Sequence, residues 1–79
     1  MTSKPKLSSR LTLREMEIAR LVAQGKTNAR IAKRLRIRSW TVAIHLRRIF
    51  AKLEVNSRTA MVARLIEKGL LTPTHRRSA

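Results

Sequence analysis

The chain has 79 residues and a formal net charge of +15, because 19 lysines and arginines outnumber four acidic residues. Such a charge favours a polyanionic partner, most commonly nucleic acid, although charge alone does not separate DNA from RNA or an anionic membrane. The absence of cysteine excludes disulfides and thiolate metal sites, and the absence of aspartate excludes a phospho-acceptor aspartate.

Both ends of the chain are polar, basic and contain proline. We expect a flexible basic lead-in over residues 1–10, one domain over 11–71, and a flexible basic tail over 72–79. No stretch resembles a signal peptide or is long and apolar enough to span a membrane. We therefore expect a cytoplasmic protein with no membrane partner.

The first two predicted helices are marked by their end signals. A helix begins after Thr12, which stands three residues before Glu15 in the spacing of a capping box, and Gly25 ends it in the left-handed cap position. A second, shorter helix begins near Thr27 or Asn28. Three of its residues have the helical spacing of a core face: Ile31, Ala32 and Leu35.

A turn over residues 36–38, with Ile37 pointing into the core, leads into a third helix over 39–53. A fourth helix covers about 57–68 and is closed by Gly69. Four helical patterns and no strand pattern predict an all-α, four-helix fold, with a helix-turn-helix in its second and third helices. The core face of the third helix holds Val42, Leu46, Ile49, Phe50 and Leu53.

The opposite side of the third helix has a composition unusual for a helix that is merely solvated. It carries Trp40, Ile44, Arg47, Arg48 and Ala51, with Ala43 on the flank. Small residues permit close approach to DNA, Ile44 can contact a thymine methyl, and Arg47 can bond guanine O6 and N7. The pattern favours base reading in the major groove. The alternatives are a phosphate contact or solvated arginine at Arg47, and a scattered surface hydrophobe at Ile44.

Groups suited to phosphates surround this helix. The start of the second helix offers backbone N–H groups and a positive dipole end at Thr27 and Asn28. Five further side chains could reach the flanking DNA backbone: Lys26, Arg30, Thr41, Arg48 and Lys52. A lone surface cation is weak evidence, so their grouping around one helix carries the prediction.

Two ring side chains in the third helix have open interpretations. Trp40, the only tryptophan, either packs against Ile37 and the second helix or lies beside a sugar-phosphate. His45 lies at the boundary between the two faces. We expect a structural role for His45 rather than metal binding, because no partner ligand lies nearby in the sequence.

The fourth helix has a wider apolar arc than a small core needs. Met61, Val62, Leu65 and Ile66 span about 140° at helical spacing. The surplus indicates a second contact surface, and we expect a two-fold homodimer with Val62 and Ile66 in its interface. Alternatively, these residues cap the core or face another domain of a longer protein.

A set of motifs with regular spacing covers residues 11 to 66 or so. Its positions are Leu11 to Ile18, Leu21 to Asn28, Ile31-Ala32, Thr41-Val42, His45-Leu46, Ile49, Lys52-Leu53, Val55 and Arg58-Thr59. In these motifs and their spacing the chain resembles the LuxR/GerE-type DNA-binding domain. The resemblance implies a four-helix domain of a bacterial transcription regulator that binds double-stranded DNA, commonly as a dimer formed by the fourth helix. RNA polymerase is a further candidate partner.

By position, the resemblance implies base reading by Ala43, Ile44 and Arg47, and phosphate contacts at Thr41 and Lys52. Relatives often carry a long basic side chain where this chain has Ala43, so one base contact is missing.

The resemblance has two structural implications. Arg38 replaces the serine that usually caps the third helix, which leaves Ser39 to cap it one residue later. An ion pair between Glu15 and Arg58 would tie the first helix to the fourth.

No catalytic constellation is present in the sequence. The four glutamates and two histidines form no nucleophile–base pair, metal spacing or phosphate loop. We expect no enzyme activity, metal, cofactor or small-molecule ligand. The main alternative to a DNA-binding regulator is a helix-turn-helix that docks a sigma factor or another regulator. A membrane-active peptide would need basic and apolar halves exposed together on one helix.

Overall fold

The computed structural model describes residues 10–73, and four helices form this part of the chain. They are α1 (Leu13–Ala23), α2 (Asn28–Leu35), α3 (Ser39–Leu53) and α4 (Arg58–Glu67). The described residues contain no strand, so the all-α prediction is confirmed. None of these helices is long and apolar enough to cross a membrane. Most of the predicted lead-in and tail, residues 1–9 and 74–79, lies outside the described residues.

Side chains cap three of the four helices. The Thr12 hydroxyl accepts the Glu15 N–H at 3.1 Å, and a Glu15 carboxylate oxygen accepts the Thr12 N–H at 2.9 Å, which completes the predicted capping box. Thr27 and Ser57 cap α2 and α4 in the same way through their hydroxyls. Gly25 follows α1 with φ +86°, a left-handed conformation that glycine adopts without steric cost.

The start of α3 corrects one expectation. Arg38, and not Ser39, is the residue that precedes the helix, and its side chain makes no capping hydrogen bond. Ser39 already has helical geometry, so its hydroxyl is not in the position that a cap requires. The turn before it bends at Arg36, which adopts φ +59°.

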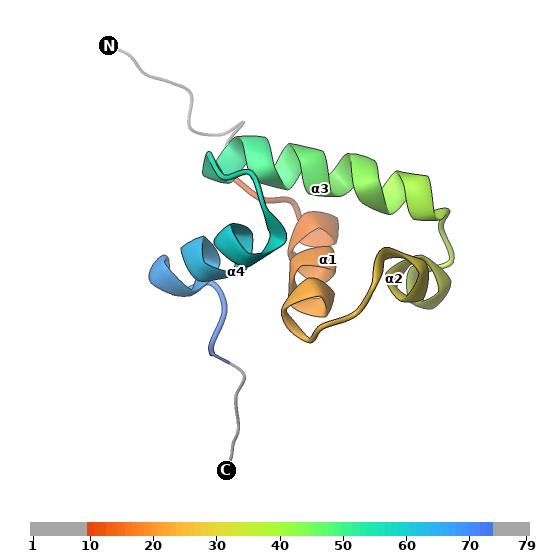
Figure 1. Ribbon diagram of the computed structural model, residues 1–79, viewed down its shortest axis with the longest axis horizontal. Helices are drawn as coiled ribbons and strands as arrows, with labels where there is room; N and C mark the ends of the chain where they lie inside the picture. Colours follow the sequence, from red (N-terminus) through yellow and green to blue (C-terminus); the bar gives the residue numbers. More distant parts are fainter. Residues whose placement is uncertain (1–9, 74–79) are drawn as a thin grey trace.

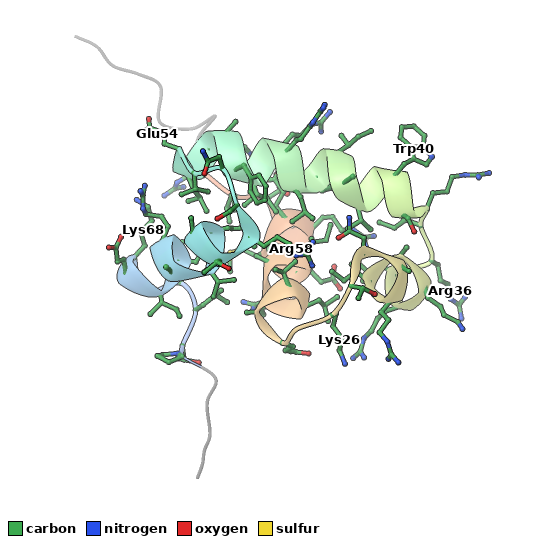
Figure 2. All side chains as sticks on the ribbon, viewed as in Figure 1. Lys26, Arg36, Trp40, Glu54, Arg58 and Lys68 are labelled. Carbon is green, nitrogen blue, oxygen red and sulfur yellow. The ribbon has the colours of Figure 1, made fainter. Side chains whose placement is uncertain are left out.

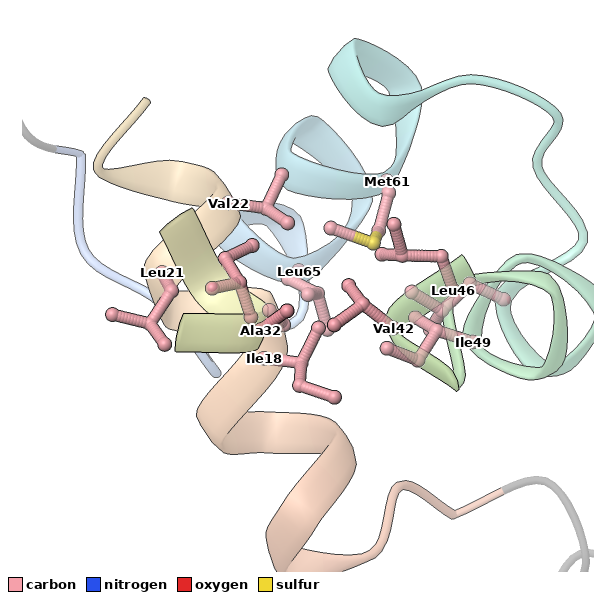
Figure 3. Close-up of a cluster of buried hydrophobic side chains, with 12 residues drawn as sticks. Ile18, Leu21, Val22, Ala32, Val42, Leu46, Ile49, Met61 and Leu65 are labelled. Carbon is pink, nitrogen blue, oxygen red and sulfur yellow. The ribbon is translucent and has the colours of Figure 1, made fainter. Parts of the chain in front are cut away.

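Twelve buried apolar side chains from all four helices form one core (Figure 3). The third helix contributes Val42, Leu46, Ile49 and Leu53, as its periodicity predicts, while Phe50 is half-buried at the edge. Ile37 packs against the core from the turn, as expected. The other core members are Ile18, Ala19, Leu21, Val22, Ile31, Ala32, Met61 and Leu65.

The longest helix, α3, lies across the other three along one edge of the molecule (Figure 1). It contacts α1, α2 and α4, so one side of α3 is covered along its length. The opposite side has no neighbouring element within the described part of the chain and faces solvent.

Candidate nucleic-acid interface

The solvent side of α3 presents a straight row of side chains. Trp40, Ile44, Arg47 and Ala51 follow one another at intervals of four, three and four residues, which places them on one face of a helix. Ile44 is half-buried and the other three are exposed. Figure 2 shows Trp40 pointing away from the other helices. The row, together with Thr41 and Arg48 beside it, forms one accessible strip on the longest helix.

The strip carries positive charge, and none of the ion pairs in the described part of the chain involves Arg47 or Arg48. The four acidic residues are at positions 15, 17, 54 and 67, so α2, the following turn and α3 contain none. In the described residues, Glu17 pairs with Arg14 on α1 and Glu67 pairs with Arg64 on α4, both at helix spacing. The helix-turn-helix therefore has a positive potential suited to a polyanion.

One lysine expected at a phosphate has protein partners instead. The Lys52 ammonium lies 2.7 Å from a Glu15 carboxylate oxygen and donates to the Arg10 carbonyl at 2.9 Å. Glu15 is almost fully buried, with 3% of its surface exposed. This ion pair ties the start of α1 to the end of α3, and we therefore exclude Lys52 from the phosphate-binding set proposed below.

The surroundings of Glu15 favour its charged form. Burial alone would raise the pKa of this carboxyl, but the hydrogen bonds from Lys52 and from the Thr12 backbone, with the positive charge of Lys52, hold the pKa below its ordinary value of 4.5. His45 contributes in the same direction. Glu15 is thus a buried anion that the fold stabilises through a cap and an ion pair.

The expected ion pair between Glu15 and Arg58 is wrong. Arg58 instead donates to the Asn28 side-chain oxygen at 2.7 Å and to the Lys26 carbonyl at 2.8 Å. The reason is positional: Arg58 is the first residue of α4 and lies against the loop between α1 and α2, whereas Glu15 faces the end of α3. Arg58 therefore fixes the start of α2 to α4.

The remaining phosphate candidates divide into two groups. Thr41 and Arg48 belong to α3 and lie beside the exposed row. Thr27, Asn28 and Arg30 lie at the start of α2, where the Thr27 hydroxyl already accepts the Arg30 N–H at 3.2 Å.

Lys26 directly precedes the second group, in the loop between α1 and α2. In Figure 2 its side chain extends from the side of the molecule opposite to Trp40. The structure therefore does not bring Lys26 next to the exposed row of α3.

The ring side chains have contrasting environments. Trp40 is 62% exposed, so Ile37 and α2 leave most of its surface uncovered. His45 is half-buried, and its Nδ1 is buried without a hydrogen-bond partner. No group of three potential metal ligands occurs among residues 10–73.

A groove of about 760 Å³ runs between the end of α1, the following loop and α4. Val62 and Ile66 line it and are half-buried, whereas Met61 and Leu65 of the same helix are in the core. Val62 also packs in part against the core, whereas Ile66 does not belong to the core cluster. The other lining residues are Val22, Ala23, Gly25, Lys26, Thr27, Arg58, Thr59 and Ala63.

A capped four-helix domain whose longest helix presents a basic, accessible strip defines a helix-turn-helix protein. The chain belongs to the luxR family of bacterial regulatory proteins, because the GerE family model matches residues 9–65. The family and the names of the relatives below are those of transcription regulators and not of enzymes.

Two relatives and one solved structure illustrate the similarity. The chain is 50% identical over 54 residues to the monoamine regulon transcriptional regulator of Klebsiella aerogenes, covering 68% of this chain and 24% of that protein. It is 46% identical over 59 residues to the transcriptional regulatory protein DesR of Bacillus subtilis, covering 75% and 30%. The crystal structure of the response regulator ChrA, from a heme-sensing two-component system, superposes with a TM-score of 0.81 at 37% identity, covering 89% and 34%.

These comparisons define a domain-level relationship. The chain spans less than a third of each of the two relatives and about a third of the ChrA chain. It is a LuxR-family helix-turn-helix domain, a class that binds DNA in transcription regulation.

Proposed function

We propose that the chain is a sequence-specific regulator of transcription that binds double-stranded DNA in the bacterial cytoplasm. In this proposal α3 enters the major groove with its exposed side toward the bases. The observation that carries the proposal is the accessible row on α3, within a helix-turn-helix that contains no acidic residue.

Base reading is assigned to three residues of α3. The exposed Arg47 guanidinium has no acidic partner within residues 10–73 and is free to bond O6 and N7 of a guanine. Ile44 offers an apolar contact for a thymine methyl, and Ala43 permits close approach of the helix to the bases. A long basic side chain at Ala43 would add a contact that this chain lacks.

Backbone contacts are assigned to the polar and basic residues around the row. Arg48 and Thr41 flank it on α3, while the start of α2 supplies Thr27, Asn28 and Arg30. The hydrogen bonds of Arg58 to Asn28 and to the preceding loop support this assignment, because they hold the start of α2 in a fixed place. Lys26 is retained only as a peripheral contact.

We propose a homodimer in which α4 packs against α4 of a second copy. Val62 and Ile66 support this surface, because they line a groove and are only half-buried in the single chain. A two-fold interface buries the same patch on both copies and would place two α3 helices about one DNA turn apart.

The dependence of binding on salt tests the backbone contacts. We expect log affinity for a duplex to fall linearly with log salt, with a slope of roughly −4 to −8 for the dimer, since each neutralised phosphate contributes about −0.9. The measurement is a fluorescence-anisotropy titration of a labelled duplex at several salt concentrations. A flat salt dependence, or no binding, would refute the backbone contacts and favour the protein-docking alternative.

Substitution of Ile66 by glutamate tests the dimer. We expect Ile66→Glu to lower affinity for a two-half-site duplex by roughly tenfold or more, equivalent to at least ~1.4 kcal/mol, with a smaller effect on a single half-site. The added charge would have to be buried in the interface. Titrations of both duplexes and the helical circular-dichroism signal give the comparison.

Leu13→Glu is the matched control for Ile66→Glu. Leu13 is 90% exposed on α1, so this substitution adds the same negative charge outside the groove. It should affect the two duplexes equally. A folded Ile66→Glu variant that also affects them equally would leave α4 without a role in assembly.

A further inference from the structure

Trp40 is a large apolar side chain that does not belong to the hydrophobic core. It is 62% exposed at the second position of α3 and is the only tryptophan in the chain. The other strongly exposed large hydrophobics, Leu13 and Leu70, lie on α1 and after α4. An isolated surface hydrophobe needs no explanation, but Trp40 begins the row that continues through Ile44 and Arg47. Its place in that row indicates a contact outside the domain.

Charge around Trp40 identifies the kind of partner. The turn that precedes it contains Arg36 and Arg38, and no acidic residue occurs in α2, the turn or α3. An occupant of this surface therefore meets uncompensated positive charge, which favours DNA over a protein without an acidic face. Trp40 also lies at the N-terminal end of α3, the part of a recognition helix that contacts base edges.

The spacing along the helix gives the position of the contact. Trp40 precedes Ile44 by four residues, which corresponds to about 6 Å along the helix axis. Successive base pairs are about 3.4 Å apart. Trp40 therefore meets the duplex within about two base pairs of the base pair that Ile44 contacts.

The chemistry of the indole indicates which group of the duplex Trp40 contacts. The face of the indole is apolar. Its Nε1–H can donate one hydrogen bond, and the ring has no atom that accepts one. In the major groove the apolar group on a base edge is the C5-methyl of thymine. The indole face suits that methyl, with its N–H left for a phosphate or base acceptor.

We propose that Trp40 is a specificity-determining residue whose indole packs on a thymine methyl at one edge of each half-site. The proposal rests on the function proposed above and adds a preference, at a defined distance from Ile44, that the residues assigned to base reading do not supply.

The first test uses the intrinsic fluorescence of the protein. With one tryptophan and no tyrosine, the emission excited above the phenylalanine range comes from Trp40 alone. We expect the emission to shift or be quenched in parallel with the anisotropy of a labelled preferred duplex. Binding by anisotropy without any change in emission would overturn this inference and leave the proposed function intact. No binding by anisotropy would overturn both.

The second test removes the methyl groups one at a time. Each thymine of the preferred site is replaced by uracil, and we expect a loss of about three- to fivefold at one position within two base pairs of the Ile44 contact. Trp40→Ala should abolish this penalty, and Trp40→Phe should retain part of it. Ile44→Ala is the matched control, because it should keep this penalty and lose a different one. Identical uracil penalties in Trp40→Ala and the wild type, or no thymine at that position, would overturn the inference.

Discussion

Replacing Arg47 with alanine is expected to lower affinity for the preferred duplex by about 1–3 kcal/mol, or roughly five- to 150-fold, while hardly changing affinity for scrambled DNA. The guanidinium is exposed on the outward row of α3 and has no acidic partner among the described residues. A bidentate contact to guanine carries sequence information, whereas a contact to a phosphate does not. Preference should therefore flatten at one base position in each half-site.

Arg48→Ala is the matched control for Arg47→Ala. Arg48 has the same side chain and is also exposed, but it lies about 100° around α3 from Arg47, beside the row. It should weaken binding to both duplexes by similar factors and make the salt slope shallower by about one. Both variants are titrated on both duplexes at fixed salt. If Arg47→Ala weakens both duplexes equally, Arg47 is a backbone contact and the proposed reading face is misplaced.

Replacing Lys52 with methionine is expected to lower the free energy of unfolding by about 1.5–3 kcal/mol. Methionine keeps most of the apolar stem but removes the ammonium that bonds Glu15 at 2.7 Å and the Arg10 carbonyl at 2.9 Å. The carboxylate of Glu15 would then remain buried without its ion-pair partner. Urea unfolding followed by circular dichroism measures the loss.

The same ion pair predicts a dependence of stability on pH. The folded-state pKa of Glu15 is depressed, so its contribution is present above the unfolded value, about 4.5, and is lost as the pH falls through the folded pKa. Acidification below about pH 4.5 should therefore destabilise the wild type, and Lys52→Met should reduce this effect. Glu15→Gln, which removes the charge but keeps an acceptor for the Thr12 N–H, should reduce it as well.

The binding data decide between the two roles of Lys52. A structural lysine leaves the salt slope of the folded Lys52→Met variant unchanged. A slope shallower by about one, with an unchanged free energy of unfolding, would instead make Lys52 a phosphate contact.

Helix boundaries could be predicted from the sequence because their signals are local. The Thr12 and Glu15 spacing and Gly25 each act within one turn of backbone, and each is found at the helix end it predicts. The start of α3 could not be predicted from the same signals. Without a serine at position 38, nothing local distinguished a cap at Ser39 from an uncapped helix that begins there.

Partners of charged residues depend on packing between distant segments. The sequence offers several cationic side chains as partners for Glu15. The arrangement of α1, α3 and α4 brings Lys52 to Glu15 and places Arg58 against the loop before α2. The exposed side of α3 was predictable from its periodicity, because the core face of that helix is strongly apolar. The direction of Lys26 was not, because a loop residue has no such period.

Selection from a random pool of DNA duplexes tests the central claim most directly. If α3 reads bases and α4 forms a two-fold dimer, the bound pool should be enriched in one sequence repeated as two inverted half-sites, centred about one helical turn, roughly 10 base pairs, apart. A guanine that depends on Arg47 should occur in each half. A bound pool with the same base composition at every position as the starting pool would contradict sequence-specific recognition by this chain.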